Sequence, residues 1–121
     1  MKNKKILIID DDSRNIFALA AVLKAKGFQI VSSTSAVEGL KLLQEDKGIG
    51  VVLMDIMMPD MDGYEAIAKI RSNPALAKLP VIAVTAQAMV GDREKSLAAG
   101  ANDYISKPID VDALLSMLNK Y

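Results

Sequence analysis

The stretch Ile6-Leu7-Ile8-Ile9-Asp10-Asp11-Asp12 decides the fold, because a short apolar run stops abruptly at three acids. Two more runs end in the same way. Residues 51–54 (VVLM) stop at Asp55, and residues 81–84 (VIAV) stop at Thr85. These runs are apolar throughout and do not alternate, which is typical of strands buried on both faces of a parallel sheet.

A fourth, shorter run ends at a basic residue. Tyr104-Ile105-Ser106 is followed by Lys107 and Pro108. If the four runs are neighbouring parallel strands, their carboxyl ends share one edge of the sheet, and that edge is where open α/β sheets bind ligands. Acids, a hydroxyl and an amine meet there. In a chain without histidine or cysteine, these groups suit Mg²⁺ and phosphate.

Composition narrows the classes of function. A chain of 121 residues, 51% apolar and 25% charged, predicts one globular domain spanning residues 1–121. Fifteen basic residues balance fifteen acidic ones without a Lys/Arg stripe, so no direct contact with nucleic acid or an anionic membrane is expected. The absence of cysteine excludes disulfides, zinc-thiolate sites and thiol catalysis, and the absence of histidine removes the commonest general base.

Targeting signals are weak. No apolar stretch reaches the roughly 18 residues that a membrane span requires. The basic start, residues 1–5, leads into only four strong hydrophobes, too few for a signal peptide. We therefore expect no membrane insertion and a cytoplasmic location.

Helical patterns lie between the predicted strands. In residues 13–26 the apolar positions follow helical spacing, and Gly27 ends the pattern. Further helices are predicted over residues 35–45, 64–71 and 87–99 and from residue 110 onward, with a weaker strand over residues 28–31. Five strands thus alternate with five helices, which predicts right-handed βαβ units in a three-layer α/β sandwich. Periodicity does not determine the order of the strands.

The acidic triplet and Asp55 are candidate ligands for a cation. Adjacent carboxylates repel one another, and Mg²⁺ compensates that repulsion by binding their oxygens. Either Asp12 or Ser13 is interpreted as a helix cap. Asp55 ends the most hydrophobic strand, where a carboxylate nucleophile can attack a phosphoryl group, and the carbonyl of Met57 is a further candidate oxygen ligand.

Two side chains at the same edge suit phosphate. The Thr85 hydroxyl is placed to bond a phosphate oxygen, and the small Ala86 beside it leaves room for a bulky group. Lys107 supplies a point charge for phosphate, and Pro108 directly after it restricts the local backbone and is compatible with a cis bond.

These motifs, in this order and spacing, closely resemble the receiver domain of bacterial response regulators. The matching fragments are Ile8–Asp12, Leu53–Gly63, Val84-Thr85-Ala86 and Tyr104–Pro108. The resemblance covers almost the whole chain and implies a flavodoxin-like, doubly wound (βα)5 sandwich with the parallel strand order 2-1-3-4-5. Residues 12–19 and 88–95 are similar to receivers attached to hybrid sensor histidine kinases, so two organisations fit: a receiver that stands alone and one cut from a larger protein.

The resemblance also implies roles for individual residues. Asp55 would accept a phosphoryl group from a histidine kinase or a histidine phosphotransfer protein. Asp11 would bind Mg²⁺ directly, Asp10 would act mostly through water, and Met57 would lend its carbonyl. Lys107 would bind the phosphoryl group.

A switch in a partner-binding face is implied as well. Thr85 and Tyr104 would form the switch pair, and the surface of the fourth helix, fifth strand and fifth helix would be read by a partner or by a second copy of the domain. The chain would then be no enzyme in its own right, because it assists only its own phosphorylation and dephosphorylation.

Two other classes use related folds. A Mg²⁺-dependent phosphatase or phosphotransferase of the haloacid-dehalogenase type expects an Asp-x-Asp nucleophile after the first strand, followed by Gly-Thr, whereas Ser13 and Arg14 follow the acids here. A flavin-binding domain needs a phosphate loop rich in Ser, Thr and Gly after that strand, and this loop is acidic. A phosphatase assay and an absorption spectrum separate the three classes.

Overall fold

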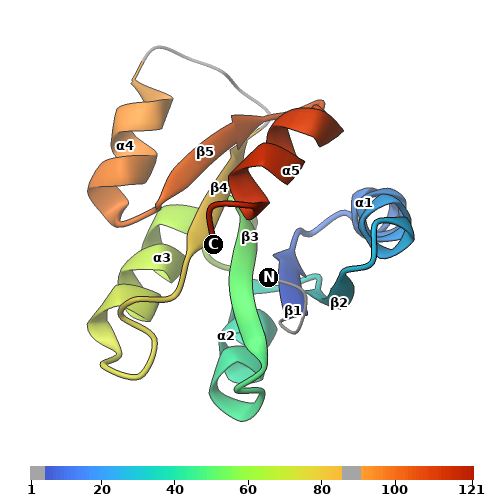
Figure 1. The fold of residues 1–121 in the computed structure, drawn as a ribbon. Helices are drawn as coiled ribbons and strands as arrows, with labels where there is room; N and C mark the ends of the chain where they lie inside the picture. Colours follow the sequence, from blue (N-terminus) through green and yellow to red (C-terminus); the bar gives the residue numbers. More distant parts are fainter. Residues whose placement is uncertain (1–4, 86–90) are drawn as a thin grey trace.

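The computed structural model describes residues 5–85 and 91–121. Its five strands form one parallel sheet in the order β2-β1-β3-β4-β5, which confirms the predicted flavodoxin-like topology (Figure 1). The strands are β1 (Lys5–Ile9), β2 (Gln29–Ser33), β3 (Ile49–Asp55), β4 (Val81–Thr85) and β5 (Asp103–Ser106), and the helices are α1 (Ser13–Ala25), α2 (Ala36–Glu45), α3 (Gly63–Ser72), α4 (Asp92–Ala99) and α5 (Val111–Leu118).

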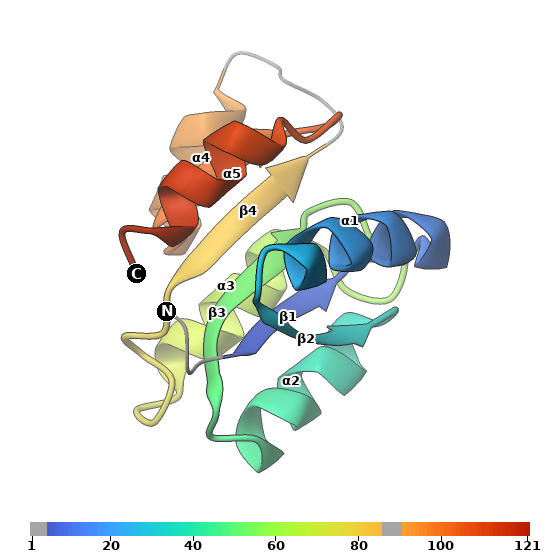
Figure 2. The same cartoon turned by 45° about the vertical axis from the view of Figure 1, so that its right-hand side comes forward.

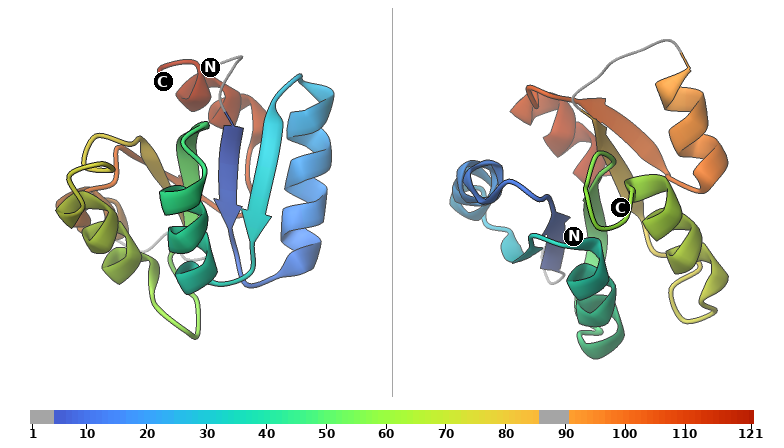
Figure 3. Two further views of the ribbon diagram at one scale, coloured as in Figure 1. Left: turned by 90° about the horizontal axis from the view of Figure 1, so that it is seen from below. Right: turned by 180° about the vertical axis from the view of Figure 1, so that it is seen from behind.

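The sheet is covered on both faces. Helices α1 and α5 lie on one face, and α2, α3 and α4 lie on the other (Figures 1 and 3). Alternate residues along each strand enter one of two cores because successive side chains of a strand point to opposite faces. Ile8 and Leu53 pack with α1 and α5, whereas Ile9 and Met54 pack with α2 and α3. All residues of β3 and β4 are buried, as their continuous apolar sequences predict.

Most predicted elements are present, with shifted ends. The second strand covers Gln29–Ser33, whereas residues 28–31 were predicted, and α3 begins one residue earlier than predicted. The predicted helix over residues 87–99 is wrong in its start. Gly91 has a left-handed φ of 97°, which a helix does not accept, and α4 begins after it at Asp92. Residues 87–90 lie outside the described part of the chain.

The connections after β1, β3 and β5 share one edge of the sheet, and this edge positions the candidate site. Figure 2 shows α1 and α5 together in front of the strands, next to these connections. Within residues 5–85 and 91–121, no helix combines the length and the apolar composition needed to cross a membrane.

Candidate metal and phosphoryl site

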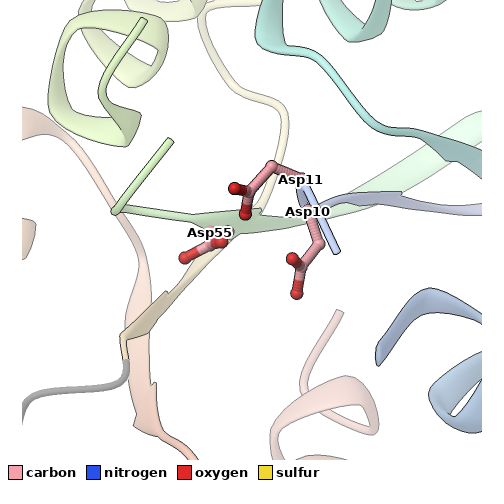
Figure 4. A group of neighbouring side chains, drawn as sticks. All are labelled: Asp10, Asp11 and Asp55. Carbon is pink, nitrogen blue, oxygen red and sulfur yellow. The ribbon is translucent and has the colours of Figure 1, made fainter. Parts of the chain in front are cut away.

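Three carboxylates lie together at the carboxyl edge of the sheet. One oxygen each from Asp10, Asp11 and Asp55 lie within 4.8 Å of one another, and Figure 4 shows the three side chains gathered where β1 and β3 end. Asp10 and Asp55 are buried, whereas Asp11 is exposed. The structure therefore joins residues 45 positions apart in the sequence into one acidic cluster that remains open to solvent on the Asp11 side.

Asp10 is held in place from several sides. Its backbone N–H donates to the Ser33 carbonyl of the neighbouring strand at 3.1 Å. Its Oδ1 accepts the backbone N–H of Asp12 at 2.9 Å, and its Oδ2 lies 3.1 Å from the Lys107 Nζ. Because these contacts use one oxygen each, the carboxylate has a restricted orientation at the end of β1.

Asp55 is the last residue of β3 and is only 4% exposed. Its Oδ1 accepts the backbone N–H of Met57 at 3.2 Å, and its Oδ2 lies 3.7 Å from the Lys107 Nζ. The Met57 side chain itself is exposed. Asp55 is therefore a buried carboxylate at the end of the central strand, oriented by the Met57 N–H and lying beside a cation.

Lys107 reaches the acids because of where β5 ends. Its backbone N–H donates to the Thr85 carbonyl at 2.7 Å, and its peptide bond to Pro108 is cis. Asp10, Asp55 and Lys107 each follow a strand residue of the α1/α5 core by two positions, so the alternation of side chains carries all three to the same side of the sheet.

Burial and charge change the acid–base properties of this cluster. Burial raises the pKa of Asp55 to about 6, and the charges of Asp10 and Asp11 add to this effect against the opposing influence of Lys107 and the Met57 N–H. Burial alone would lower the pKa of Lys107, but the hydrogen bond to Asp10 and the surrounding carboxylates raise it overall. The lysine is therefore a permanent cation, whereas Asp55 gains a negative charge near neutral pH.

The third acid of the triplet has another task. Asp12 is the N-cap of α1, and its Oδ1 accepts the backbone N–H of Arg14 at 2.9 Å. The Arg14 guanidinium also contacts this carboxylate at 3.3 Å, and the pKa of Asp12 is lowered by these bonds. Of the two caps that the sequence left open, Asp12 and Ser13, the structure uses Asp12.

Thr85 and Tyr104 occupy the opposite side of the sheet from Asp55. Thr85 is buried at the end of β4 and pairs with Ser106, while Ala83 pairs with Tyr104. Paired residues and residues two apart share a face, so Thr85 and the half-buried Tyr104 lie on the face covered by α2, α3 and α4. Ala86, which was predicted to leave space at the site, lies outside the described residues, as do Gln87 to Val90.

Sequence reasoning missed two residues next to the site. Ser33 is buried beside Asp10, and the Asp60 carboxylate accepts backbone N–H groups from Ala36 and Val37 in α2. Both contacts join segments that are far apart in the chain. A polar residue at the end of the second strand and an acid after Pro59 were the only local signals, and both suit ordinary turns.

The donor set fits Mg²⁺. The cluster offers carboxylate oxygens and includes no sulfur or imidazole, and its open side leaves room for water. Magnesium usually takes one or two protein carboxylates and completes its octahedron with water and phosphate oxygens. Asp10, Asp11 and Asp55 are the side chains that would hold it.

Binding of Mg²⁺ is expected to weaken as the pH falls through about 6, because a proton on Asp55 competes with the metal. Between pH 7 and pH 5 we expect a loss of about tenfold in affinity, the effect of one competing proton. Titrations of Mg²⁺ at pH 5, 6 and 7 measure this. The Asp55→Asn variant should bind Mg²⁺ more weakly, and its affinity should not fall further between pH 7 and pH 5. An identical pH dependence in both proteins would contradict the assignment to Asp55.

Comparison with known proteins identifies similar chains. The family model described as "Response regulator receiver domain" matches residues 6–119. Protein PilH of Pseudomonas aeruginosa is 34% identical over 115 residues, which are 95% of this chain and 94% of PilH. The signal transduction histidine-protein kinase BarA of Escherichia coli is 40% identical over 119 residues, which are 96% of this chain but 12% of BarA. The chain also spans about half (51%) of the probable transcriptional regulator ycf29 of Pyropia yezoensis, at 36% identity over 95% of its own length.

Solved structures similar to this chain are also receiver proteins or domains. A response regulator receiver protein from Pseudomonas putida superposes with a TM-score of 0.91 at 30% identity and covers 100% of this chain and 99% of that one. The receiver domain of the sensor histidine kinase PA1611 from Pseudomonas aeruginosa superposes with a TM-score of 0.89 at 31% identity, covering 98% and 97% of the two chains. The PA1611 structure is described as having a magnesium ion coordinated in its active site cleft.

Proposed function

Because this chain belongs to the response regulator receiver domain family, we propose that it accepts a phosphoryl group on Asp55 and thereby switches a partner-binding surface. The observation that carries this proposal is the position of Asp55, which is buried at the end of β3 with acids on one side and Lys107 on the other. The family acts in two-component signalling as a phosphoacceptor switch. The assignment of its roles to particular residues of this chain is our proposal.

The residues present can perform the transfer. In the ionised state, Asp55 offers an oxygen that forms a new bond to phosphorus while the bond from phosphorus to the donor nitrogen or oxygen breaks, and the product is an acyl phosphate. Lys107, which lies 3.7 Å from Asp55, is placed to bind a phosphoryl oxygen and balance its charge. Bound Mg²⁺ supplies further positive charge to the same oxygens. Asp10, Asp11 and Asp55 would hold the metal, with Asp11 as the direct ligand, Asp10 acting mostly through water, and the Met57 carbonyl as a further ligand.

The chemistry is tested with a small phosphodonor. Acetyl phosphate with Mg²⁺ should add one phosphoryl group to the intact chain, detected by mass spectrometry, and the addition should stop when Mg²⁺ is chelated. The chain should not turn over an added phosphate ester, because we propose that it is a switch and no general phosphatase. Sustained release of phosphate from such an ester would favour the phosphatase alternative.

We further propose that the phosphodonor is a histidine kinase or a histidine phosphotransfer protein, and that it contacts the edge formed by α1. A groove of about 270 Å³ runs between α1 and residues 107–111, and Asp10 and Lys107 line both this groove and the acidic cluster. Phe17, on the same helix, is 78% exposed. A donor that brings its phosphoryl group to Asp55 necessarily covers this edge, and an exposed aromatic side chain is typical of a protein contact.

The switch would lie on the other side of the sheet. A phosphoryl group on Asp55 adds negative charge near Thr85 and Lys107, and Thr85 would bond it by moving toward the site. Tyr104 shares a face with Thr85 and has an apolar ring with a polar tip, so it can exchange between buried and exposed positions. The surface of α4, β5 and α5 would then change, and a partner or a second copy of the chain would bind it. Met89 and Val90, which were predicted to belong to this surface, lie outside the described residues.

NMR of the chain with Mg²⁺ and a beryllofluoride mimic of the phosphoryl group tests this switch. We expect the largest amide shifts at residues 85–90 and 100–107, because the mimic draws Thr85 toward the site and frees space for Tyr104. Shifts confined to residues 56–62, with Tyr104 unchanged, would show that signalling uses another face. Sedimentation of the same samples shows whether the altered face binds a second copy.

A further inference from the structure

The loop after Asp55 is attached to a helix that takes no part in the site. One oxygen of Asp60, Oδ2, accepts the backbone N–H of Ala36 at 3.1 Å and that of Val37 at 3.4 Å. These are the first two N–H groups of α2, and the third, from Glu38, donates to the Ser35 Oγ at 3.0 Å. The free N–H groups at the start of a helix require acceptors. Here two of them are satisfied by a residue 24 positions later in the chain.

The base of the same loop is closed tightly. The Gly63 N–H donates to the Ile56 carbonyl at 2.9 Å. A Cβ at position 63 would lie 2.6 Å from the Ile56 Cα and 2.7 Å from the Asp55 carbonyl oxygen, so only glycine fits. Between this closure and Asp60, Met58 is buried in the core beside α2 and α3, the Met57 side chain is exposed, and the Met57 N–H donates to Asp55. Asp60 therefore adds a polar attachment of the outer part of the loop to α2, next to the apolar packing of Met58 and Met61.

The start of α2 is also connected to Asp10. The Ser33 carbonyl accepts the Asp10 N–H at 3.1 Å, and the Ser33 hydroxyl donates to the Ser35 carbonyl at 2.7 Å and accepts the Ser35 N–H at 3.2 Å. Ser35 is the N-cap of α2. The first turn of α2 thus joins the two loops that bear the acidic cluster, one through Ser33 and the other through Asp60.

From these contacts we infer that Asp60 is a positioning residue for the metal site, acting through the N-terminus of α2. It holds the loop of residues 56–62 at a set distance from Asp10, and so places the Met57 carbonyl relative to the acids. This inference rests on the proposed Mg²⁺ site. It adds a consequence that the site alone does not have: metal binding changes the environment of the backbone amides of Ala36 and Val37, which contact Asp60.

Three variants test it. In Asp60→Ala both hydrogen bonds to α2 are lost, and Mg²⁺ affinity should fall about threefold to tenfold. This is less than the roughly tenfold to hundredfold loss for a residue bonded directly to a metal ligand, because Asp60 acts through the loop. Asp60→Asn removes the same charge but keeps a side-chain oxygen, so it should restore most of the affinity. Asp62→Ala removes a charge and a helix cap from the same loop, since Asp62 accepts the Glu65 N–H at 2.8 Å, and it should bind Mg²⁺ within about twofold of the unmodified chain.

Two NMR readouts separate positioning from general stability. In the unmodified chain, Mg²⁺ should shift the amides of Ala36 and Val37, and this shift should disappear in Asp60→Ala. Without any metal, hydrogen exchange at the Met57 amide should be faster in Asp60→Ala and unchanged in Asp62→Ala.

The outcomes are distinct. Equal losses in Asp60→Ala and Asp60→Asn would show a charge effect and overturn the inference, as would Mg²⁺ binding and Met57 exchange in Asp60→Ala that match the unmodified chain. Failure of the unmodified chain to bind Mg²⁺ would overturn the proposed function and with it the role of Asp60 at a metal, whereas normal binding with no effect of Asp60 would overturn this inference alone.

Discussion

Asp55→Asn is expected to abolish phosphorylation of the chain, with no phosphoryl group added above background by acetyl phosphate and Mg²⁺. An amide is a far weaker nucleophile than a carboxylate, and no other described acid combines burial, the end of β3 and contact with Lys107. Asp10 contacts Lys107 more closely, at 3.1 Å, but it follows β1 and is assigned here to the metal. Mass spectrometry of the intact protein measures the result.

Asp62→Asn is the matched control for this variant. Asp62 lies seven positions later, is exposed, and caps α3 by accepting the Glu65 N–H. Asparagine is a comparably good cap, so the fold should be preserved while one acid becomes an amide, as in Asp55→Asn. The Asp62→Asn control should gain a phosphoryl group to the same extent as the unmodified chain. Continued labelling of Asp55→Asn at the normal level would mean that another carboxylate is the acceptor.

Asp55→Asn should also be more stable than the unmodified chain in the absence of metal. The pKa of Asp55 in the folded chain, about 6, lies above the ordinary value of 3.8 for an aspartate, so the folded state disfavours the charged form. The resulting penalty is fully present above pH 6 and is relieved as the pH falls through 6 toward 3.8. At pH 7 we expect Asp55→Asn to raise the free energy of unfolding by about 1–2 kcal/mol, less than the full shift implies because water reaches the site edge. Urea unfolding with a chelator measures this gain, which should disappear near pH 4.

Asp11→Ala is expected to weaken Mg²⁺ binding by about tenfold or more, whereas Asp12→Ala should change it by less than about threefold. Asp11 places a carboxylate oxygen within 4.8 Å of those of Asp10 and Asp55, so its loss removes a ligand from the cluster. The Asp12 carboxylate is engaged by Arg14 at the start of α1 and is not a member of the cluster.

Stability should show the opposite order for these two variants. Loss of the Asp12 cap should lower the free energy of unfolding by about 1 kcal/mol, the usual effect of removing an N-cap. Loss of the exposed Asp11 relieves repulsion among the acids and should not destabilise the metal-free chain. Mg²⁺ titration and urea unfolding of both variants give the two orders independently. Equal losses of Mg²⁺ affinity would mean that the wrong member of the triplet has been assigned to the metal.

Much of this protein was determined by local features of its sequence. Continuous apolar runs such as residues 51–54 predict strands buried on both faces, since no polar side chain is left for solvent. The acids that follow or end β1 and β3 mark the edge of the sheet, because a charged side chain is not expected inside a strand buried on both faces. Alternation with helices then predicts a parallel three-layer sandwich, and the resemblance to receiver domains supplied the strand order that periodicity leaves open.

The tertiary structure alone decided which atoms of these polar groups contact one another and how burial shifts their pKa values. Lys107 lies against Asp10 across 97 positions of the chain, and Asp60 caps a helix that precedes it by 24 positions. No pattern within one segment encodes such contacts, because they depend on how the ends of separate elements meet. The raised pKa of Asp55 is of the same kind, because it comes from loss of water on burial and from charges on other loops. Sequence placed the acids at one edge; packing determined their protonation, their partners and the loop that positions them.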